Sequence, residues 1–188
     1  MPNPYFSFKQ FTVYHDRCAM KVGTDGVLLG AWVDVVSARN ILDVGTGTGL
    51  ISLMMAQRCN AQIRAVDIDA DAVEQARGNV AASPWQDRIE VELQDICHFT
   101  SETLFDVIVS NPPYFTDSLK CPERQRNIAR HTDLLDFDKL AESAARLLHS
   151  EGVFSVIIPA DGKESLEACH SLRITSLTPD FNSYKTWN

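Results

Sequence analysis

The segment Ile41-Leu42-Asp43-Val44-Gly45-Thr46-Gly47-Thr48-Gly49-Leu50 decides the fold of this chain. Its first four residues have the pattern of a buried strand, and three glycines on alternate positions form a turn. The apolar residues Ile51 to Ala56 then begin a helix. Glycine is required where a Cβ would collide with a closely bound ligand. A strand, a glycine-rich turn and a helix in this order indicate a cofactor site in an α/β fold.

The spacing of the glycines distinguishes between cofactors. A dinucleotide fingerprint requires glycine or alanine at the sixth position, which is Leu50 here. Instead, the glycines alternate, and the acid Asp43 lies two residues before the first of them. This is the pattern of enzymes that bind S-adenosylmethionine (SAM). We therefore predict that Asp43, Gly45, Gly47 and Gly49 belong to a SAM site.

Two further acids follow the next two predicted strands. Asp67 ends the strand Ile63–Val66, about twenty residues after the glycine-rich turn, where a second strand delivers a carboxylate to ribose hydroxyls. The alternative is that Asp67 caps the next helix, a role that we assign to Asp69. Asp95 follows the strand Ile89–Leu93, and it either accepts from the adenine amino group of the cofactor or is an ordinary loop aspartate.

A second turn, Asn111-Pro112-Pro113-Tyr114, follows the apolar run Phe105 to Ser110. Consecutive prolines lack amide donors and fix φ, so the chain must leave the sheet in a stiff extended turn. The Asn111 amide, the Pro112 carbonyl and the Tyr114 ring then lie at the carboxyl end of a strand, where ligands bind in open α/β sheets. We predict that Asn111 to Tyr114 hold a planar substrate with an amino group. The alternative is a rigid turn in which Asn111 caps a helix.

Cationic residues cluster although the formal net charge is −8. That charge argues against a broad nucleic-acid-coating surface, but a local basic surface is compatible with it. Cations gather after the second turn and in the N-terminal segment: Lys120, Arg124, Arg126 and Arg130 in the first group, and Lys9, Arg17 and Lys21 in the second. We predict that Arg124, Arg126, Arg130 and His131 contact the substrate, against the alternatives of a solvated loop and a structural histidine.

Length and composition indicate one domain. The chain has 188 residues, and its five cysteines show neither a Cys-x-x-Cys pair nor metal-ligand spacing. The first ten residues lack a signal core, and no apolar run approaches the length of a membrane span. We expect a soluble cytoplasmic monomer without a metal site.

Alternating strand and helix patterns predict an α/β fold, a Rossmann-like doubly wound and mostly parallel sheet. We expect one domain over residues 1–188, with an N-terminal extension (1–36) packed on a core (37–178), and a tail (179–188). A sixth strand at Leu172–Leu177 lacks a visible partner, since the tail contains Pro179 and polar residues, so the C-terminal hairpin is predicted to be incomplete. Further expected elements are strands at 63–66, 89–93, 105–110 and 153–158, a small extended element at 5–13, and helices at 25–36, 50–57, 70–80, 137–148 and 163–170.

The segments Phe6–Phe11 and His15–Trp32 resemble the bacterial tRNA(Val) (adenine-N6)-methyltransferase family. The resemblance extends to about Gly162 and includes both turns, Asp67 and Ala129-Arg130-His131. Both turns are shared with many amino-group methyltransferases, so it is the resemblance of the N-terminal segments that points to this particular family. Family members continue beyond this length, and the residues after Ser171 match poorly.

The resemblance implies SAM as cofactor, tRNA as partner and the adenosine 3′ of the anticodon (position 37) as substrate. It also places Lys21, Thr24 and Asp25 near the methionine end of SAM, against the alternative that Thr24 or Asp25 caps a helix. Alternative functions are an rRNA guanine or protein glutamine methyltransferase, or a non-catalytic RNA-binding protein. The absence of a separate RNA-binding domain before Ile41 argues against the first two.

Overall fold

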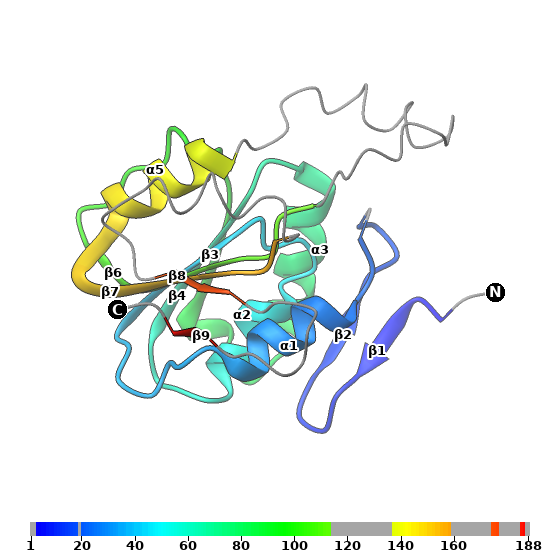
Figure 1. The fold of residues 1–188 in the computed structure, drawn as a ribbon. Coiled ribbons are helices and arrows are strands. Elements are labelled where there is room, and N and C mark those ends of the chain that lie inside the picture. Colours follow the sequence, from blue (N-terminus) through cyan, green and yellow to red (C-terminus); the bar gives the residue numbers. More distant parts are fainter. Residues whose placement is uncertain (1–2, 19, 114–136, 159–173, 177–184, 187–188) are drawn as a thin grey trace.

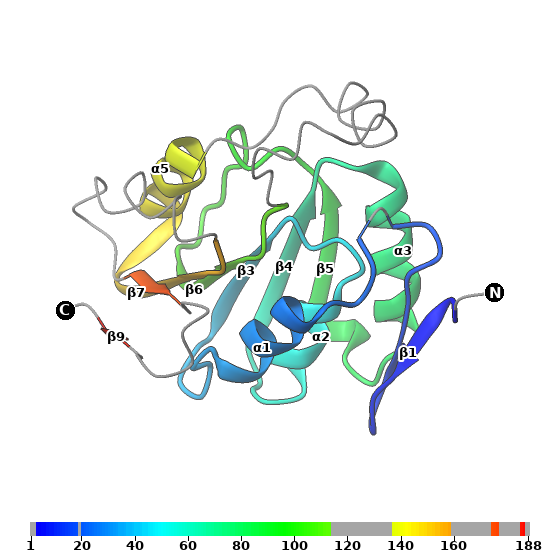
Figure 2. The ribbon, with the colours of Figure 1, turned by 45° about the vertical axis from the view of Figure 1, so that its right-hand side comes forward.

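The computed structural model describes residues 3–18, 20–113, 137–158, 174–176 and 185–186. Its centre is a sheet of seven strands: β3 (Asn40–Val44), β4 (Gln62–Asp67), β5 (Ile89–Leu93), β6 (Phe105–Ser110), β7 (Leu148–Val156), β8 (Ile174–Ser176) and β9 (Lys185–Thr186). The order is β5-β4-β3-β6-β7-β8-β9, parallel from β5 to β8, with β9 antiparallel to β8 (Figures 1 and 2). The predicted Rossmann-like fold class is confirmed.

Helices cover both faces of this sheet. On one face lie α1 (Thr24–Trp32), α2 (Leu50–Ala56) and α3 (Ala70–Ala81), and on the other lies α5 (Phe137–Leu147) (Figures 1 and 2). Alternate residues of a strand point to opposite faces, so in β3 Ile41 packs with the first group of helices and Leu42 with the second. The short 3-10 helix η1 (Gln86–Arg88) leads into β5. Both faces of the sheet are therefore buried, which explains why its strands have continuous apolar sequences.

Two glycines allow α1 to approach α2 closely. A Cβ on Gly30 would lie 2.8 Å from the Met54 Sδ, and one on Gly26 would lie 3.2 Å from the Leu50 Cδ2. Because the two glycines are four residues apart, they face α2 on one side of α1. Helix α1 therefore packs closely against α2 because Gly26 and Gly30 carry no side chain. It ends at Trp32, earlier than the predicted Val36.

An N-terminal hairpin packs beside α3. Strands β1 (Tyr5–Ser7) and β2 (Thr12–Tyr14) are antiparallel, and Phe11 and Val13 are buried in the core shared by α1, α2 and α3. The Asn79 side chain of α3 is 2 % exposed; its Oδ1 accepts from the Tyr14 amide at 2.9 Å, and its Nδ2 donates to the Tyr14 carbonyl at 2.8 Å. Nδ2 also donates to the carbonyl of Thr48 at 2.8 Å. One buried amide therefore joins the hairpin to the glycine-rich turn.

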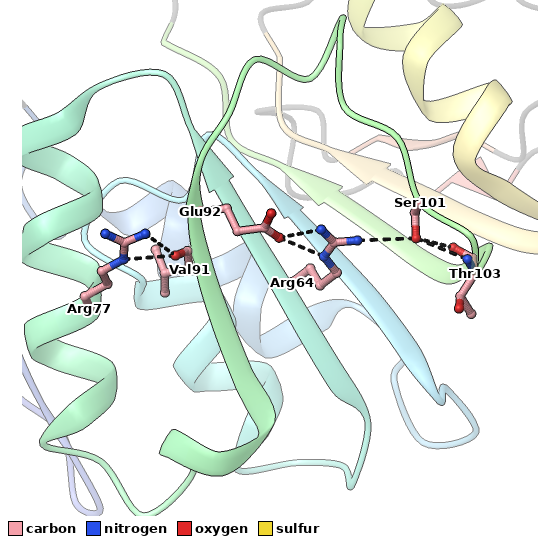
Figure 3. Close-up of polar contacts among 6 residues, drawn as sticks. All are labelled: Arg64, Arg77, Val91, Glu92, Ser101 and Thr103. Carbon is pink, nitrogen blue, oxygen red and sulfur yellow. Dashed lines mark hydrogen bonds and ion pairs between the residues drawn. The ribbon is translucent and has the colours of Figure 1, made fainter.

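Two arginines fasten strand β5 at the edge of the sheet (Figure 3). Arg77 of α3 donates through Nε and an Nη to the Val91 carbonyl, at 3.0 and 2.9 Å. Arg64 of β4 makes an ion pair with Glu92 at 2.6 Å, and its Nη1 lies 3.4 Å from the Ser101 Oγ. The edge strand is thus bound through side chains on both of its faces in addition to its backbone pairing with β4.

The predicted strands at 41–44, 63–66, 89–93 and 105–110 and the helices at 50–57, 70–80 and 137–148 are confirmed, with small shifts of their ends. The predicted sixth strand is confirmed as β8. The expectation that it lacks a partner is wrong, because β9 pairs with it antiparallel, Thr175 opposite Thr186. Backbone groups hold an antiparallel pair together, so polar residues can supply the partner. The predicted helix at 163–170 lies outside the described residues.

Candidate functional site

The glycine-rich turn (residues 45–49) uses left-handed backbone at three positions. Gly45, Gly47 and Gly49 have φ values of 70°, 55° and 78°, which other residues rarely adopt. A Cβ on Gly45 or Gly47 would meet no atom within 4 Å, whereas one on Gly49 would contact Ala76 of α3. The first two glycines therefore border open space at the carboxyl end of β3, and the third packs against the protein.

Asp43 lies buried beneath this turn. Its Oδ2 accepts from the Thr46 hydroxyl at 2.7 Å, the Ser52 hydroxyl at 2.6 Å and the Ser52 amide at 3.2 Å. Its Oδ1 is also buried, and among the described residues it has no hydrogen-bond partner. Burial raises the pKa of Asp43 to about 6, although the bonds from Ser52 and Thr46 oppose the shift. One carboxylate oxygen thus shapes the turn, and the other is left as a buried acceptor.

Asp67 ends β4 beside the glycine-rich turn. Its Oδ2 accepts from the Gly47 amide at 2.8 Å and its Oδ1 from the Asp69 amide at 3.0 Å. Burial raises the pKa of Asp67. The N-cap of α3 is Asp69, which accepts from the Asp71 amide. The predicted role of Asp69 is confirmed and the capping alternative for Asp67 is wrong. A carboxylate has about four lone-pair sites, so Asp67 keeps acceptor capacity.

Two exposed apolar side chains lie near Asp67 and were not singled out from the sequence. Ile68 directly follows Asp67 and is 56 % exposed, and Leu93, which is 52 % exposed, pairs with Asp67 across β4 and β5. The only sequence signal was their place at the ends of buried strands. Asp95, two residues after Leu93, accepts from the Cys97 amide at 2.9 Å and pairs with His98 at 3.1 Å. These contacts lie within its own loop, and the contact of Asp95 with the adenine amino group stays a prediction.

The segment after β2 also adjoins Asp67. Burial and then the negative charges of Asp67 and Asp69 raise the pKa of Cys18 to about 12. The amide of Arg17 donates to the Gln75 side chain of α3 at 3.0 Å. The N-terminal segment therefore packs on α3 near Asp67, a placement that no local sequence pattern indicates.

Asn111 and the two prolines of the second turn leave β6 next to β3. Ser110, the last residue of β6, lies opposite Val44 in the parallel pair, and its hydroxyl donates to the Val44 carbonyl at 2.9 Å. A Cβ on Gly26 of α1 would lie 3.8 Å from the Asn111 Nδ2. Pro112 is buried and Pro113 exposed. The two turns are therefore neighbours at one end of the sheet, and the Asn111 turn lies at the carboxyl end of a strand, as predicted.

Lys21 and Thr24 are exposed at the start of α1, the helix that Asn111 adjoins. The N-cap of α1 is Gly23, and no side chain caps it, so the capping alternative for Thr24 and Asp25 is wrong. The remaining predicted site residues lie outside the described part of the chain: Tyr114, Arg124, Arg126, Arg130 and His131.

A cavity of about 410 Å³ lies at the amino ends of the strands, opposite the two turns, where Asn40, Gln62 and Phe105 line it. Its arginines are already bound by the protein: Arg64 by Glu92, and Arg88 by two backbone carbonyls. This cavity is therefore a poor candidate for an anion site. Within the described ranges, no group of three or more His, Cys, Asp or Glu could hold a metal ion, and no helix is long and apolar enough to cross a membrane.

Comparisons with known proteins agree with this geometry. Residues 18–167 match the model of the methyltransferase small domain. A Phocaeicola vulgatus protein named tRNA1(Val) (adenine(37)-N6)-methyltransferase is 95 % identical over 88 % of this chain and 70 % of its own length. A Bacteroides thetaiotaomicron protein of the same name is 58 % identical over 91 % of this chain and 73 % of its own. The CcbJ methyltransferase of Streptomyces caelestis shares the fold, with a TM-score of 0.53 and 21 % identity over 72 % of this chain and 52 % of that one.

Proposed function

Because this chain belongs to the methyltransferase small domain family, we propose that it transfers the methyl group of SAM to N6 of adenosine 37 in tRNA1(Val). Relatives at 95 % and 58 % identity carry that name. The observation that carries the proposal is the placement of the two turns. The glycine-rich turn and the Asn111 turn (residues 111–114) follow adjacent parallel strands, so a cofactor on one and a substrate on the other would meet.

The residues present fit SAM. Gly45 and Gly47 border space that any side chain would enter, as a closely bound nucleoside requires. The free Oδ1 of Asp43 is a buried acceptor that suits the ammonium of the methionine part, and Asp67 suits the ribose diol. Ile68 offers an apolar surface to the adenine ring. We assign Asp95, Lys21 and Thr24 to the outer parts of the same site, and SAM would supply the electrophilic methyl group.

The Asn111 turn would orient the nucleophile. The amino nitrogen of adenine is a poor nucleophile because its lone pair is delocalised into the ring. If the Asn111 side-chain oxygen and the Pro112 carbonyl each accept one amino hydrogen, the nitrogen becomes more tetrahedral and its lone pair points toward the methyl group. Positioning of this kind can lower a barrier by about 7–11 kcal/mol. The same acceptors stabilise the positive charge that develops on nitrogen.

The tRNA contacts are assigned from the sequence. Tyr114 would stack on the target base, which must leave its loop to reach the turn. Arg124, Arg126, Arg130 and His131 would contact the RNA backbone. We propose a cytoplasmic monomer that acts on one tRNA at a time, with residues 1–36 as an extension of a single catalytic domain.

The decisive test is methylation of an unmodified tRNA1(Val) transcript with labelled SAM, followed by nucleoside analysis. We expect N6-methyladenosine at position 37 alone. Product at guanine, or labelling of protein in place of RNA, would contradict the proposal.

Two variants separate cofactor binding from chemistry. Asn111→Ala should lower the single-turnover rate by about 10²–10³-fold, as loss of a preorganised polar contact does elsewhere, and should leave SAM affinity unchanged. Asp67→Ala should weaken SAM binding in calorimetric titration, since two hydroxyl contacts to a charged acceptor are lost. Thr103→Ala, at an exposed site beside the cavity at the amino ends of the strands, serves as the matched control. Wild-type SAM affinity in Asp67→Ala would refute the ribose assignment.

A further inference from the structure

The outward face of the N-terminal hairpin carries four hydroxylated side chains, which we name the tyrosine face: Tyr5, Ser7, Thr12 and Tyr14. In the antiparallel register Tyr5 pairs with Tyr14 and Ser7 with Thr12, so all four lie on one side of the hairpin. The two tyrosine rings are 5.6 Å apart, and the Ser7 and Thr12 hydroxyls are 3.2 Å apart. The other side carries Val13, which is buried in the core, and its register partner Phe6, which is 48 % exposed.

Both tyrosines are accessible. Tyr5 is 40 % exposed and Tyr14 is 46 % exposed, although aromatic side chains of this size are usually mostly buried. The hydroxyls of Ser7 and Thr12 interrupt the apolar surface, so the face lacks the continuous apolar centre of a protein–protein interface. Aromatic rings beside hydroxyl groups suit unpaired bases, which stack on rings and offer phosphates and 2′-hydroxyls to polar groups.

The charge of the N-terminal segment favours RNA over protein as the occupant. Residues 1–24 contain three Lys or Arg and one Asp, a net charge of +2, in a chain whose net charge is −8. Lys9 is exposed in the turn between β1 and β2, and Lys21 is exposed at the start of α1. Arg17 is paired with Glu74 at 2.9 Å, so it contributes less. Exposed cations therefore occur in the turn of the hairpin and after β2, in the same N-terminal segment as the tyrosine face, and a phosphate backbone can approach them.

Helix α3 fixes this face relative to the glycine-rich turn. Asn79 binds both backbone groups of Tyr14 and the carbonyl of Thr48, and Gln75 binds the amide of Arg17. A nucleotide held on Tyr14 is thus held at a constant position relative to the cofactor turn. The views in Figures 1 and 2 agree that the hairpin lies at the α3 side of the molecule.

We propose that the tyrosine face binds unpaired nucleotides of the tRNA substrate, by stacking of bases on Tyr5 and Tyr14. This inference rests on the proposed function and adds a second RNA contact, on a separate element from the Asn111 turn. It anchors the tRNA while the target adenosine enters the turn.

The test measures binding directly, by fluorescence anisotropy of a labelled anticodon stem-loop, and methylation separately. The double variant Tyr5→Ala/Tyr14→Ala should weaken RNA binding roughly tenfold or more, in proportion to lost stacking, with SAM affinity unchanged. Tyr5→Phe/Tyr14→Phe keeps both rings and should bind within a fewfold of wild type. Val36→Ala/Leu104→Ala removes exposed apolar groups elsewhere and should have no effect on binding.

Salt dependence distinguishes stacking from charge. The slope of log affinity against log salt should be unchanged in the tyrosine variants, and it should fall by somewhat less than one unit in Lys9→Ala. RNA affinity equal to wild type in a folded Tyr5→Ala/Tyr14→Ala variant overturns the inference. The inference is also overturned if the wild type self-associates and the double variant abolishes this self-association without a change in RNA affinity. The tyrosine face would then bind a second copy of the protein. If the wild type binds the RNA but does not methylate it, the proposed function is contradicted and the RNA-binding inference is not.

Discussion

Substitution of Asn79 by alanine tests whether one buried amide holds the N-terminal hairpin and the glycine-rich turn together. The variant removes three hydrogen bonds of 2.8–2.9 Å. It leaves the amide and carbonyl of Tyr14 and the carbonyl of Thr48 without that partner. At about 0.5–1.5 kcal/mol for each bond, the loss is about 1.5–4.5 kcal/mol. We take about 3 kcal/mol as the central expectation.

Urea unfolding measures this loss. With a slope of about 2 kcal/mol per molar urea, within the usual range, the midpoint should fall by about 1.5 M. Because the Thr48 carbonyl belongs to the cofactor turn, SAM affinity should fall as well. Ser83→Ala is the matched control: Ser83 is also buried, two residues after the end of α3, and its hydroxyl donates to the Val80 carbonyl. It should lose stability and retain SAM affinity.

A midpoint shift below about 0.5 M in Asn79→Ala, which corresponds to about 1 kcal/mol, would refute the stability argument. SAM affinity that falls equally in Asn79→Ala and Ser83→Ala would show that any loss of stability weakens the site, and would remove the specific link between hairpin and turn.

Two other predictions concern packing and pH. Gly30→Ala should destabilise the protein by about 1–3 kcal/mol, since its Cβ would lie 2.9 Å from the Met54 Cβ. Gly78→Ala in α3 should stabilise the protein by about 0.5–1 kcal/mol, because no atom lies within 4 Å of the new Cβ. Equal unfolding midpoints of the two variants would contradict the packing argument. Burial raises the pKa of Asp43 from 3.8 to about 6, so Asp43 binds a proton more tightly in the folded protein than in the unfolded chain. Its contribution to the free energy of unfolding therefore falls as pH rises from about 4 to 6 and is constant above that range. The difference in unfolding free energy between wild type and Asp43→Asn should follow that course between pH 4 and 8, and a difference that rises with pH would be inconsistent with it.

The sequence predicts the central part of the sheet because local pattern and burial agree there. Parallel strands buried on both faces are continuous apolar runs, as in Phe105–Ser110, and their carboxyl ends must meet at one edge. The neighbourhood of the two turns follows from that rule. The antiparallel partner of β8 could not be predicted, because Lys185-Thr186 pairs through backbone groups and carries no hydrophobic pattern.

The inner contacts of the site depend on residues far apart in the chain. Nothing local to Asn79 indicates that its amide joins Tyr14 to Thr48, since those partners are 65 and 31 residues away. Likewise, Asp43 looks like a cofactor ligand from its place before the glycines, but one of its oxygens is engaged by Ser52 and Thr46 inside the protein. Tertiary contacts of this kind are set by the assembled fold.

The strand order has a consequence for synthesis of the chain. Strand β3 lies inside the sheet between β4 and β6, and these two neighbours are made at different times: β4 ends at Asp67, whereas β6 begins at Phe105. At about 5–20 residues per second, the ribosome takes a further 2–8 s or so to add the residues between them. During that interval one edge of β3 has no neighbour, and its apolar side chains and unpaired backbone groups are open to other nascent chains. The step that ends this exposure is the arrival of β6, which also delivers Asn111, so the covering of β3 and the delivery of the substrate turn are one event.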